Sequence, residues 1–176
     1  MNYVYIAQSL DGYIAGPNGE LEWLEQIDNP EKSDFGFAEF MGAVDALVMG
    51  RHTFEKVVSF GFWPYDKPVF VMSRTLTTIP PDLSDKAFLL SSEPRETVET
   101  LNAKGYNNLY IDGGLLIQSF LRAGLINELI VSTLPVLLGD DIKHFGHLPS
   151  MLKLKLLNSE TLVNQMVKTR YQVENR

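Results

Sequence analysis

Two glycines follow a run of apolar residues and precede an amphipathic segment, which places them where a strand turns into a helix. The run covers residues 109–111, the glycines are Gly113 and Gly114, and the segment ends at Gly124. The first N–H groups of a helix have no acceptor within the helix, and glycine lets an anionic group approach the backbone closely. The turn therefore predicts a phosphate site, although paired glycines also serve purely steric needs in such turns.

A second turn of this kind carries positive charge. Gly50, Arg51, His52 and Thr53 follow the strand-like residues 45–49 and lead into a segment of helical character. Gly50 permits close approach to the backbone, while Thr53 supplies a hydroxyl. Arg51 and His52 add positive charge beside a helix start, so the turn suits a diphosphate or a 2′-phosphate. A helix start with solvated charges is the alternative.

A third polar turn ends the next strand-like run, residues 68–72. It consists of Ser73, Arg74 and Thr75. Two hydroxyls and a guanidinium suit a ribose phosphate, and the Arg74 guanidinium can also stack on an adenine ring. An ordinary polar strand end has the same residues, so this reading stays open as well.

Two carboxylates are candidates for acid–base work. Asp11 precedes Gly12 in a loop, where it either forms an Asx-turn or hydrogen-bonds a polar substrate and relays a proton. Asp34 stands just before a predicted helix, where it either caps the helix or faces a heterocycle as a partly buried carboxylate. In the second case burial would raise the pKa of Asp34, and turnover would depend on its protonation.

The composition limits the possible functions. The 176 residues carry a net charge of −7 at pH 7, which argues against general binding to nucleic acid or anionic membranes. It does not argue against a small anion held by local N–H groups and arginines. The chain contains no Cys, which excludes disulfides and thiolate chemistry. His144 and His147 have no third ligand in view, so we expect no metal site. Residues 1–4 lead directly into a strand without a signal peptide or a membrane-spanning stretch, so a cytoplasmic location is expected.

Strand-like and helix-like segments alternate along most of the chain. They predict an α/β fold with a mostly parallel sheet and an antiparallel hairpin at the C-terminal end, in a single domain of residues 1–176. Ligands bind such sheets outside the carboxyl ends of the strands, so the turns after residues 7, 49 and 111 are predicted to lie at one edge. The predicted strands are 3–7, 45–49, 68–72, 87–90, 109–112, 127–138 (one strand, or two interrupted by Pro135), 152–156 and 166–173, and the predicted helices are 35–42, 53–60, 94–104 and 115–123.

In this order the turns resemble those of the dihydrofolate reductase-like superfamily, over nearly the whole chain. The matching segments are the strand at 3–7, the loop from Asp11 to Ile14, the element from Asp34, the sequence M-G-R-H-T-F-E at 49–55 and the paired glycines. The resemblance implies a three-layer α/β/α fold.

Within that superfamily the chain is most similar to the reductase domain of riboflavin biosynthesis and its stand-alone relatives. S-L-D-G-Y-I-A at 9–15 resembles that family's S-L-D-G-x-I-A, and D-A-L-V-M-G at 45–50 resembles its D-A-(apolar)-(apolar)-x-G. A further series runs from the paired glycines through G-L-I-N-E-L at 124–129 to P-V-L-L-G at 135–139. The zinc deaminase signature to which this family is usually fused, H-x-E with P-C-x-x-C, is missing from the sequence.

The resemblance implies a reductase that uses NADPH on a small heterocyclic substrate, of the 5-amino-6-(5-phosphoribosylamino)uracil reductase type. Asp11 and Asp34 would be the catalytic candidates near the substrate. Dihydrofolate reduction and a non-catalytic NADPH-binding module are the alternatives. A homodimer is also implied, and the apolar residues 129–138 are either its interface or an interior strand. The implied cofactor contacts are Ala7, Ile14, Gly50, Arg51, His52, Thr53, Ser73, Arg74, Thr75, Gly113, Gly114, Leu115 and Leu116.

Overall fold

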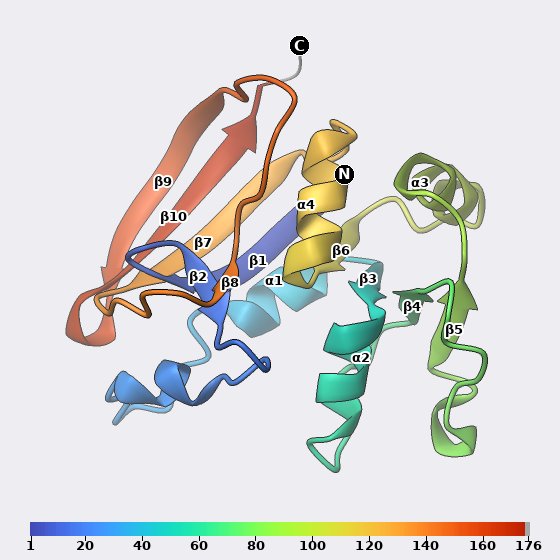
Figure 1. Ribbon diagram of the computed structural model, residues 1–176, viewed down its shortest axis with the longest axis horizontal. Coiled ribbons are helices and arrows are strands. Elements are labelled where there is room, and N and C mark those ends of the chain that lie inside the picture. Colours follow the sequence, from blue (N-terminus) through green and yellow to red (C-terminus); the bar gives the residue numbers. More distant parts are fainter. Residues whose placement is uncertain (175–176) are drawn as a thin grey trace.

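A mostly parallel sheet of eight strands forms the centre of the molecule (Figure 1). The computed structural model describes residues 1–174, apart from the side chain of Asn164. The first six strands across the sheet run parallel to one another, and the last two are antiparallel to their neighbours. In order, they are β5 (Ala87–Leu90), β4 (Val69–Met72), β3 (Ala46–Gly50), β6 (Leu109–Asp112), β1 (Asn2–Ser9), β7 (Glu128–Leu134), β10 (Met166–Val173) and β9 (Leu154–Leu162).

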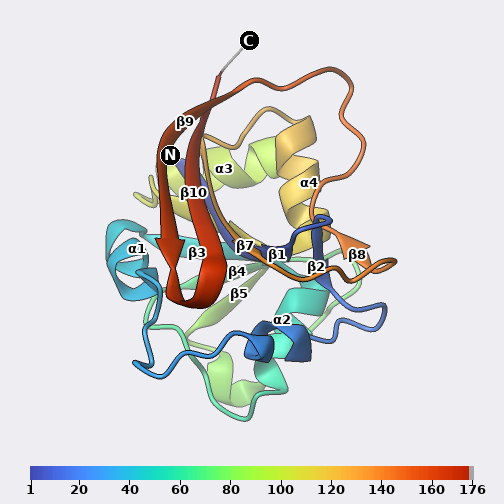
Figure 2. The same ribbon diagram turned by 90° about the vertical axis from the view of Figure 1, so that its left-hand side faces the viewer.

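Helices cover both faces of the sheet and complete three layers. One face carries α1 and α2, and the other carries α3 and α4. Figure 2 shows α1 and α4 on opposite sides of the sheet. Within the described residues, no helix is long and apolar enough to cross a membrane. The helices are α1 (Phe37–Ala43), α2 (Arg51–Val58), α3 (Pro94–Ala103) and α4 (Gly114–Arg122), with short 3-10 turns at η1 (Glu22–Gln26), η2 (Pro81–Leu83) and η3 (Val163–Gln165).

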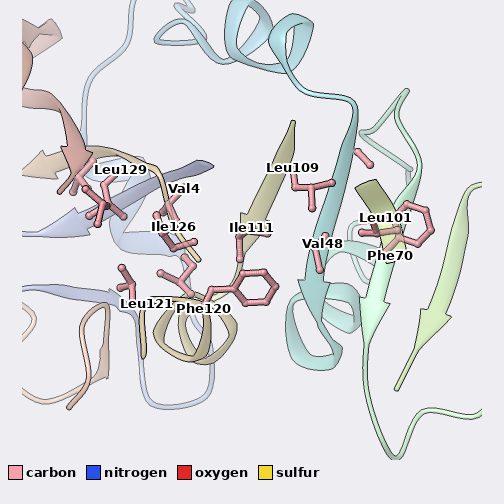
Figure 3. Packing of buried hydrophobic residues seen from close by; sticks show 14 residues of the cluster. Val4, Val48, Phe70, Leu101, Leu109, Ile111, Phe120, Leu121, Ile126 and Leu129 are labelled. Atoms are coloured by element: carbon pink, nitrogen blue, oxygen red, sulfur yellow. The ribbon is translucent and has the colours of Figure 1, made fainter. Parts of the chain in front are cut away.

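Side chains point alternately to the two faces of the sheet along each strand, so one hydrophobic core forms on each face. On β3, Val48 packs into the core under α3 and α4, whereas Leu47 and Met49 pack into the core under α1 and α2. Figure 3 shows Phe120 of α4 directed towards Ile111 of β6 in the first of these cores. Because the central strands are buried on both sides, their sequences are continuously apolar, as expected for parallel strands.

The strand order brings distant segments to one edge of the sheet. From β1 the chain builds β3, β4 and β5 outwards, and β6 later fills the place between β3 and β1. The chain then places β7 on the other side of β1. The carboxyl ends of β3, β6 and β1 are therefore neighbours at the point where the strand order reverses, which is where open α/β sheets bind ligands.

A second, two-stranded sheet lies beside this edge. It pairs β2 (Tyr13–Ala15) with β8 (Ile142–Lys143), two segments too short to give a periodic signal in the sequence. The backbone N–H of His144 donates to the carbonyl oxygen of Gly12 at 2.9 Å and continues this connection. The His144 side chain is fully buried, with Nδ1 2.7 Å from Gln8 Oε1.

The predicted fold class is confirmed, namely a three-layer α/β fold with a C-terminal hairpin of β9 and β10. The predicted strand 127–138 is shorter, because β7 ends at Leu134, directly before Pro135. The interpretation of residues 129–138 as a dimer interface is wrong for the strand part. That part is an interior strand, paired with β1 on one side and β10 on the other.

Candidate functional site

The paired glycines lie at the start of α4, against the first turn of α2. Gly113 has a φ of +97°, a conformation that glycine adopts without steric cost. A Cβ atom at this position would collide with the hydroxyl oxygen of Thr53. Two of the turns predicted to bind phosphate therefore meet in one place, and only a glycine fits between them.

Gly114 makes a similarly close approach to the small sheet. A Cβ atom there would lie 2.5 Å from Ile14 Cδ1 and 3.6 Å from the carbonyl oxygen of Lys143. Ile14 belongs to β2 and Lys143 to β8. The predicted cofactor residues Ile14, Thr53, Gly113 and Gly114 are thus brought together from three separate elements, β2, α2 and the start of α4.

Both helices at this place begin without a side-chain cap. Gly50 precedes α2 and Gly113 precedes α4, and in the described part of the chain neither start receives a hydrogen bond from a capping side chain. The first amides of each helix have no intrahelical acceptor and lie at the positive end of the helix dipole. Two such starts side by side can bind a diphosphate. The amides of Leu115 and Leu116 belong to this set, while the Leu116 side chain packs into the core.

Arg51 links the second and third predicted turns. Its Nη1 donates to Thr75 Oγ1 at 3.0 Å, and its Nε forms an ion pair with Glu55 at 2.7 Å. Ser73 Oγ lies 3.5 Å from Thr75 Oγ1. The structure therefore places a guanidinium and two hydroxyls at the ends of β3 and β4, in the same half of the site as α2.

Arg74 and His52 lie outside this group. Arg74 forms an ion pair with Glu93, the residue before α3, so its guanidinium is directed away from Arg51. The His52 side chain is 87% exposed and lies 3.9 Å from Glu55. The predicted role of Arg74 and His52 in cofactor binding is not tested by these contacts, and it stays a prediction for both residues.

Asp11 ties two loops together. Its carboxylate accepts hydrogen bonds from the Ser9 hydroxyl at 2.6 Å and from the backbone N–H of Gly139 at 2.8 Å. The N–H of Leu138 is a further donor at 3.2 Å. The Ser9 hydroxyl and the two amides lower the pKa of Asp11, so it is ionised at neutral pH and holds the loop after β7 against the loop after β1.

Asp34 caps the start of α1. Its Oδ2 accepts from the Ala38 amide and its Oδ1 from the Gly36 amide, each at 2.9 Å. These bonds lower the pKa of Asp34, because they stabilise the ionised form. The expectation that burial raises the pKa of Asp34 is wrong, and the helix-capping interpretation is confirmed.

A largely apolar pocket of about 490 Å³ opens beside Asp34. Its floor is formed by Ala7 of β1 together with Ser132 and Leu134 of β7, and Phe37 of α1 forms one wall. Ala7, predicted to contact the nicotinamide, therefore lies where the cofactor edge of the sheet and this pocket join. A pocket of this size suits a small ring compound.

Asp112 lies outside the set of site residues predicted from the sequence. It ends β6, and its carboxylate accepts the Gly113 amide at 2.8 Å. Burial raises the pKa of Asp112 to about 6, although the Gly113 amide and the Tyr110 hydroxyl oppose this shift. The sequence signal that could have identified Asp112 is an acidic residue at the end of an otherwise apolar central strand. The same Asp-Gly pair is also common in turns without any catalytic role.

Tyrosines surround this carboxyl on the face of α1 and α2. The Tyr110 hydroxyl donates to the carbonyl oxygen of Tyr5 at 2.9 Å, and the Tyr5 hydroxyl donates to that of Phe35 at 2.8 Å. Burial raises the pKa of Tyr110 and Tyr65, and that of Tyr5 to about 12. These hydroxyls keep their protons at neutral pH, so Asp112 is the member of the cluster that titrates near neutrality.

Comparison with protein-family models decides to which family these features belong. The model of the RibD C-terminal domain matches residues 3–168. The chain belongs to the RibD C-terminal domain family. Relatives in Bacillus subtilis (strain 168) include the uncharacterized protein YwjB, 33% identical over 157 residues and matched over 87% of both chains. The uncharacterized protein YyaP is 28% identical over 180 residues, covering 94% of this chain and 91% of its own length.

Solved structures share the fold of this RibD C-terminal domain. A protein of Shewanella sp. PV-4, provisionally assigned to riboflavin biosynthesis, is 46% identical with a TM-score of 0.96 over 99% of both chains. RibD of Acinetobacter baumannii shares 20% identity with a TM-score of 0.70, over 98% of this chain but 57% of its own. The Thermotoga maritima diaminohydroxyphosphoribosylaminopyrimidine deaminase/5-amino-6-(5-phosphoribosylamino)uracil reductase shares 12% with a TM-score of 0.73, over 99% and 56%. The last two establish the fold alone.

Proposed function

We propose that this RibD C-terminal domain is an NADPH-dependent reductase of a small heterocyclic substrate. The observation that carries the proposal is the contact between Gly113 and Thr53, which joins two uncapped helix starts where the strand order reverses. An apolar pocket adjoins this place at Ala7. A dinucleotide site beside a ring-sized pocket is what hydride transfer to a heterocycle requires. Membership of the RibD C-terminal domain family supports the same reaction class, since structures of this fold include a deaminase/reductase of Thermotoga maritima.

The residues present fit a nicotinamide dinucleotide. Gly113 allows the starts of α2 and α4 to come close together, and the amides at 51–53 and 114–116 would hold a diphosphate beside them. Arg51, with Ser73 and Thr75, would hold the 2′-phosphate, and Ala7 and Ile14 would orient the nicotinamide end. When bound, reduced nicotinamide supplies the hydride.

A proton must accompany the hydride, and Asp112 is the carboxyl best suited to hold it. Asp112 adjoins Gly113 and has a pKa of about 6, so a useful fraction is protonated near neutral pH. Asp11 and Asp34 are ionised under the same conditions because of their hydrogen bonds. We therefore assign these two to holding loops and helix α1 in place, while Asp112 holds the titrating proton.

Cofactor binding tests the proposal directly. Trp63 packs edge-on against Phe54 of α2, with ring centroids 6.1 Å apart, so its fluorescence should respond to a ligand at the start of α2. We expect saturable quenching that favours NADPH over NADH. The double variant Arg51→Gln/Arg74→Gln should lower the affinity for NADPH by about tenfold to a hundredfold and leave the affinity for NADH nearly unchanged. The reason is that each hydrogen bond to a charged group contributes about 1.5–3 kcal/mol.

The exposed Arg122 in the last turn of α4 provides the matched control for charge. Arg122→Gln should leave both titrations unchanged. Equal weakening of NADPH and NADH in the double variant would contradict the assignment of the 2′-phosphate. Absence of any response in folded protein would overturn the reductase proposal. NADPH binding without oxidation by any heterocycle would favour the non-catalytic module, and oxidation by dihydrofolate would favour folate reduction.

We also propose that the protein forms a homodimer through β9. This strand is the edge of the sheet, and its residues from Leu154 to Thr161 are all exposed, including Leu156 at 55%. Long apolar edges of this kind are normally covered, since they otherwise promote uncontrolled pairing. Leu156→Lys should convert a dimer into a monomer in size-exclusion chromatography with light scattering, whereas Lys155→Gln should not. A monomeric unmodified protein would contradict the proposal.

A further inference from the structure

We propose that the pocket beside Ala7 binds a flat, uncharged heterocycle and rejects substrates that carry a phosphate. The inference rests on the proposed function, since it takes this pocket as the substrate side of the reductase site. It also distinguishes this protein from the Thermotoga maritima enzyme, whose name specifies a phosphoribosylamino substrate. The argument depends on which charges line the pocket and which nearby charges are already paired.

The described residues that line the pocket include no Lys, Arg or His. Their single charged member is Asp34, and the remainder are mainly apolar or aromatic side chains, including Leu24, Ile27 and Phe37. A phosphate bound here would have no cationic partner, and burying it unpaired would be costly. A flat ring would instead find aromatic and aliphatic walls.

Asp34 gives the pocket a negative charge at neutral pH. The amides of Ala38 and Gly36 lower its pKa, so the carboxylate stays ionised while a ligand binds. Two charges of equal sign repel each other, and the repulsion is stronger where water screens the charges less. A phosphate group in the pocket would therefore be repelled as well as unpaired.

The cation that contacts the loop beside Asp34 is already neutralised, and the exposed Lys32 on that loop is not among the residues that line the pocket. Lys168 Nζ donates to the carbonyl oxygen of Phe35 at 2.8 Å and forms an ion pair with Glu160 at 2.8 Å, with only 17% of its side chain exposed. It lines a second, smaller cavity of about 290 Å³ and not the pocket beside Ala7. To hold a phosphate, Lys168 would have to leave both partners.

Arg170, the second cation that lines the smaller cavity, is also held in an ion pair and so is not available to a phosphate. Its Nε pairs with Glu128 at 2.6 Å, and the Glu128 side chain is only 12% exposed. Separating this pair would leave a largely buried carboxylate without its partner, which is strongly unfavourable.

The cationic side of the cofactor site lies at the other end, where Arg51 is exposed although paired with Glu55. Arg51 begins α2 beyond β3, and β6 separates β3 from β1. Adjacent strands are about 4.8 Å apart, so β3, which leads into Arg51, lies about 10 Å from β1 across the sheet. The molecule thus has a cofactor half built for phosphate and a substrate half built to exclude it.

Calorimetric titration with a matched pair of ligands tests the inference. The probes are 6-hydroxymethyl-7,8-dihydropterin and its diphosphate ester, each added to the protein with and without saturating NADPH. We expect the alcohol to bind at least about tenfold more tightly than the ester. Asp34→Asn should narrow this ratio by about threefold to tenfold, because it removes the repelling charge.

A gain-of-cation variant makes the test independent of Asp34. Leu24→Arg places a guanidinium at the pocket and should favour the ester, whereas the uncharged control Leu24→Gln should keep the preference for the alcohol. An ester that binds unmodified protein as tightly as the alcohol, or a failure of both to bind, would overturn the inference. Loss of NADPH binding alone, with the alcohol still preferred, would defeat the proposed function and leave the inference standing.

Discussion

Replacing Gly113 with Ala is expected to raise the dissociation constant of NADPH by at least about a hundredfold, a loss of about 2.7 kcal/mol. The added Cβ would collide with the Thr53 hydroxyl, so the starts of α2 and α4 would have to move apart. The positive φ of +97° adds roughly 1–2 kcal/mol of backbone strain for any L residue. Fluorescence titration with NADPH measures the first effect, and thermal unfolding measures the second.

Gly105 offers a control that separates these two effects. Its φ of +93° is nearly the same, but a Cβ at this position meets no atom within 4 Å. Gly105→Ala should therefore cost only the backbone strain, and so less stability than Gly113→Ala, while leaving NADPH affinity unchanged. If Gly113→Ala bound NADPH as tightly as the unmodified protein, the contact with Thr53 would not define a cofactor site.

Asp112→Asn is expected to stabilise the protein at neutral pH and to reduce turnover by at least about a hundredfold. Burial raises the pKa of Asp112 from 3.8 to about 6, so the folded state keeps a proton that the unfolded state has lost between these two pH values. The unmodified protein therefore loses stability as pH rises through this window. Above it the penalty is about 3 kcal/mol, which the neutral Asn avoids.

Urea unfolding at several pH values measures this difference. The stability gain of Asp112→Asn should be present at pH 7.5, shrink as pH falls below 6 and vanish below about 3.8. Asp34→Asn is the matched comparison, because its effect on the free energy of unfolding should have the opposite sign. The pKa of Asp34 is lowered, so its stabilising effect exists above pH 3.8 and its replacement should destabilise at neutral pH. A pH-independent difference for Asp112→Asn would contradict the assigned pKa.

Local sequence signals predicted much of the site because its parts lie directly at strand ends. Gly113 and Gly114 follow β6, and Gly50 ends β3, so each turn could be identified from a few neighbouring residues. The parallel sheet then brings these turns to one edge, which the strand pattern alone implies. The contact of Gly113 with Thr53 is the structural outcome of that rule.

Long-range packing decided what the sequence could not predict. The pKa of Asp112 depends on burial beneath Tyr110 and near Tyr65, which is far away in sequence. The partner of Arg74 is Glu93, which stands before a different helix. Asp34 could be a cap or a buried acid by its position alone, and only the two amide donors distinguish these cases.

The late insertion of β6 between β3 and β1 has a consequence for how the chain folds. β1 is made first, yet both of its pairing partners, β6 and β7, lie in residues 109–134. Until residue 112 has been synthesised, neither edge of this strand has a native neighbour, and the edge that pairs with β7 stays open until residue 134. Such non-local pairing slows folding and leaves strand edges open to aggregation, so the growing chain depends on the second half of the sheet to protect its first strand.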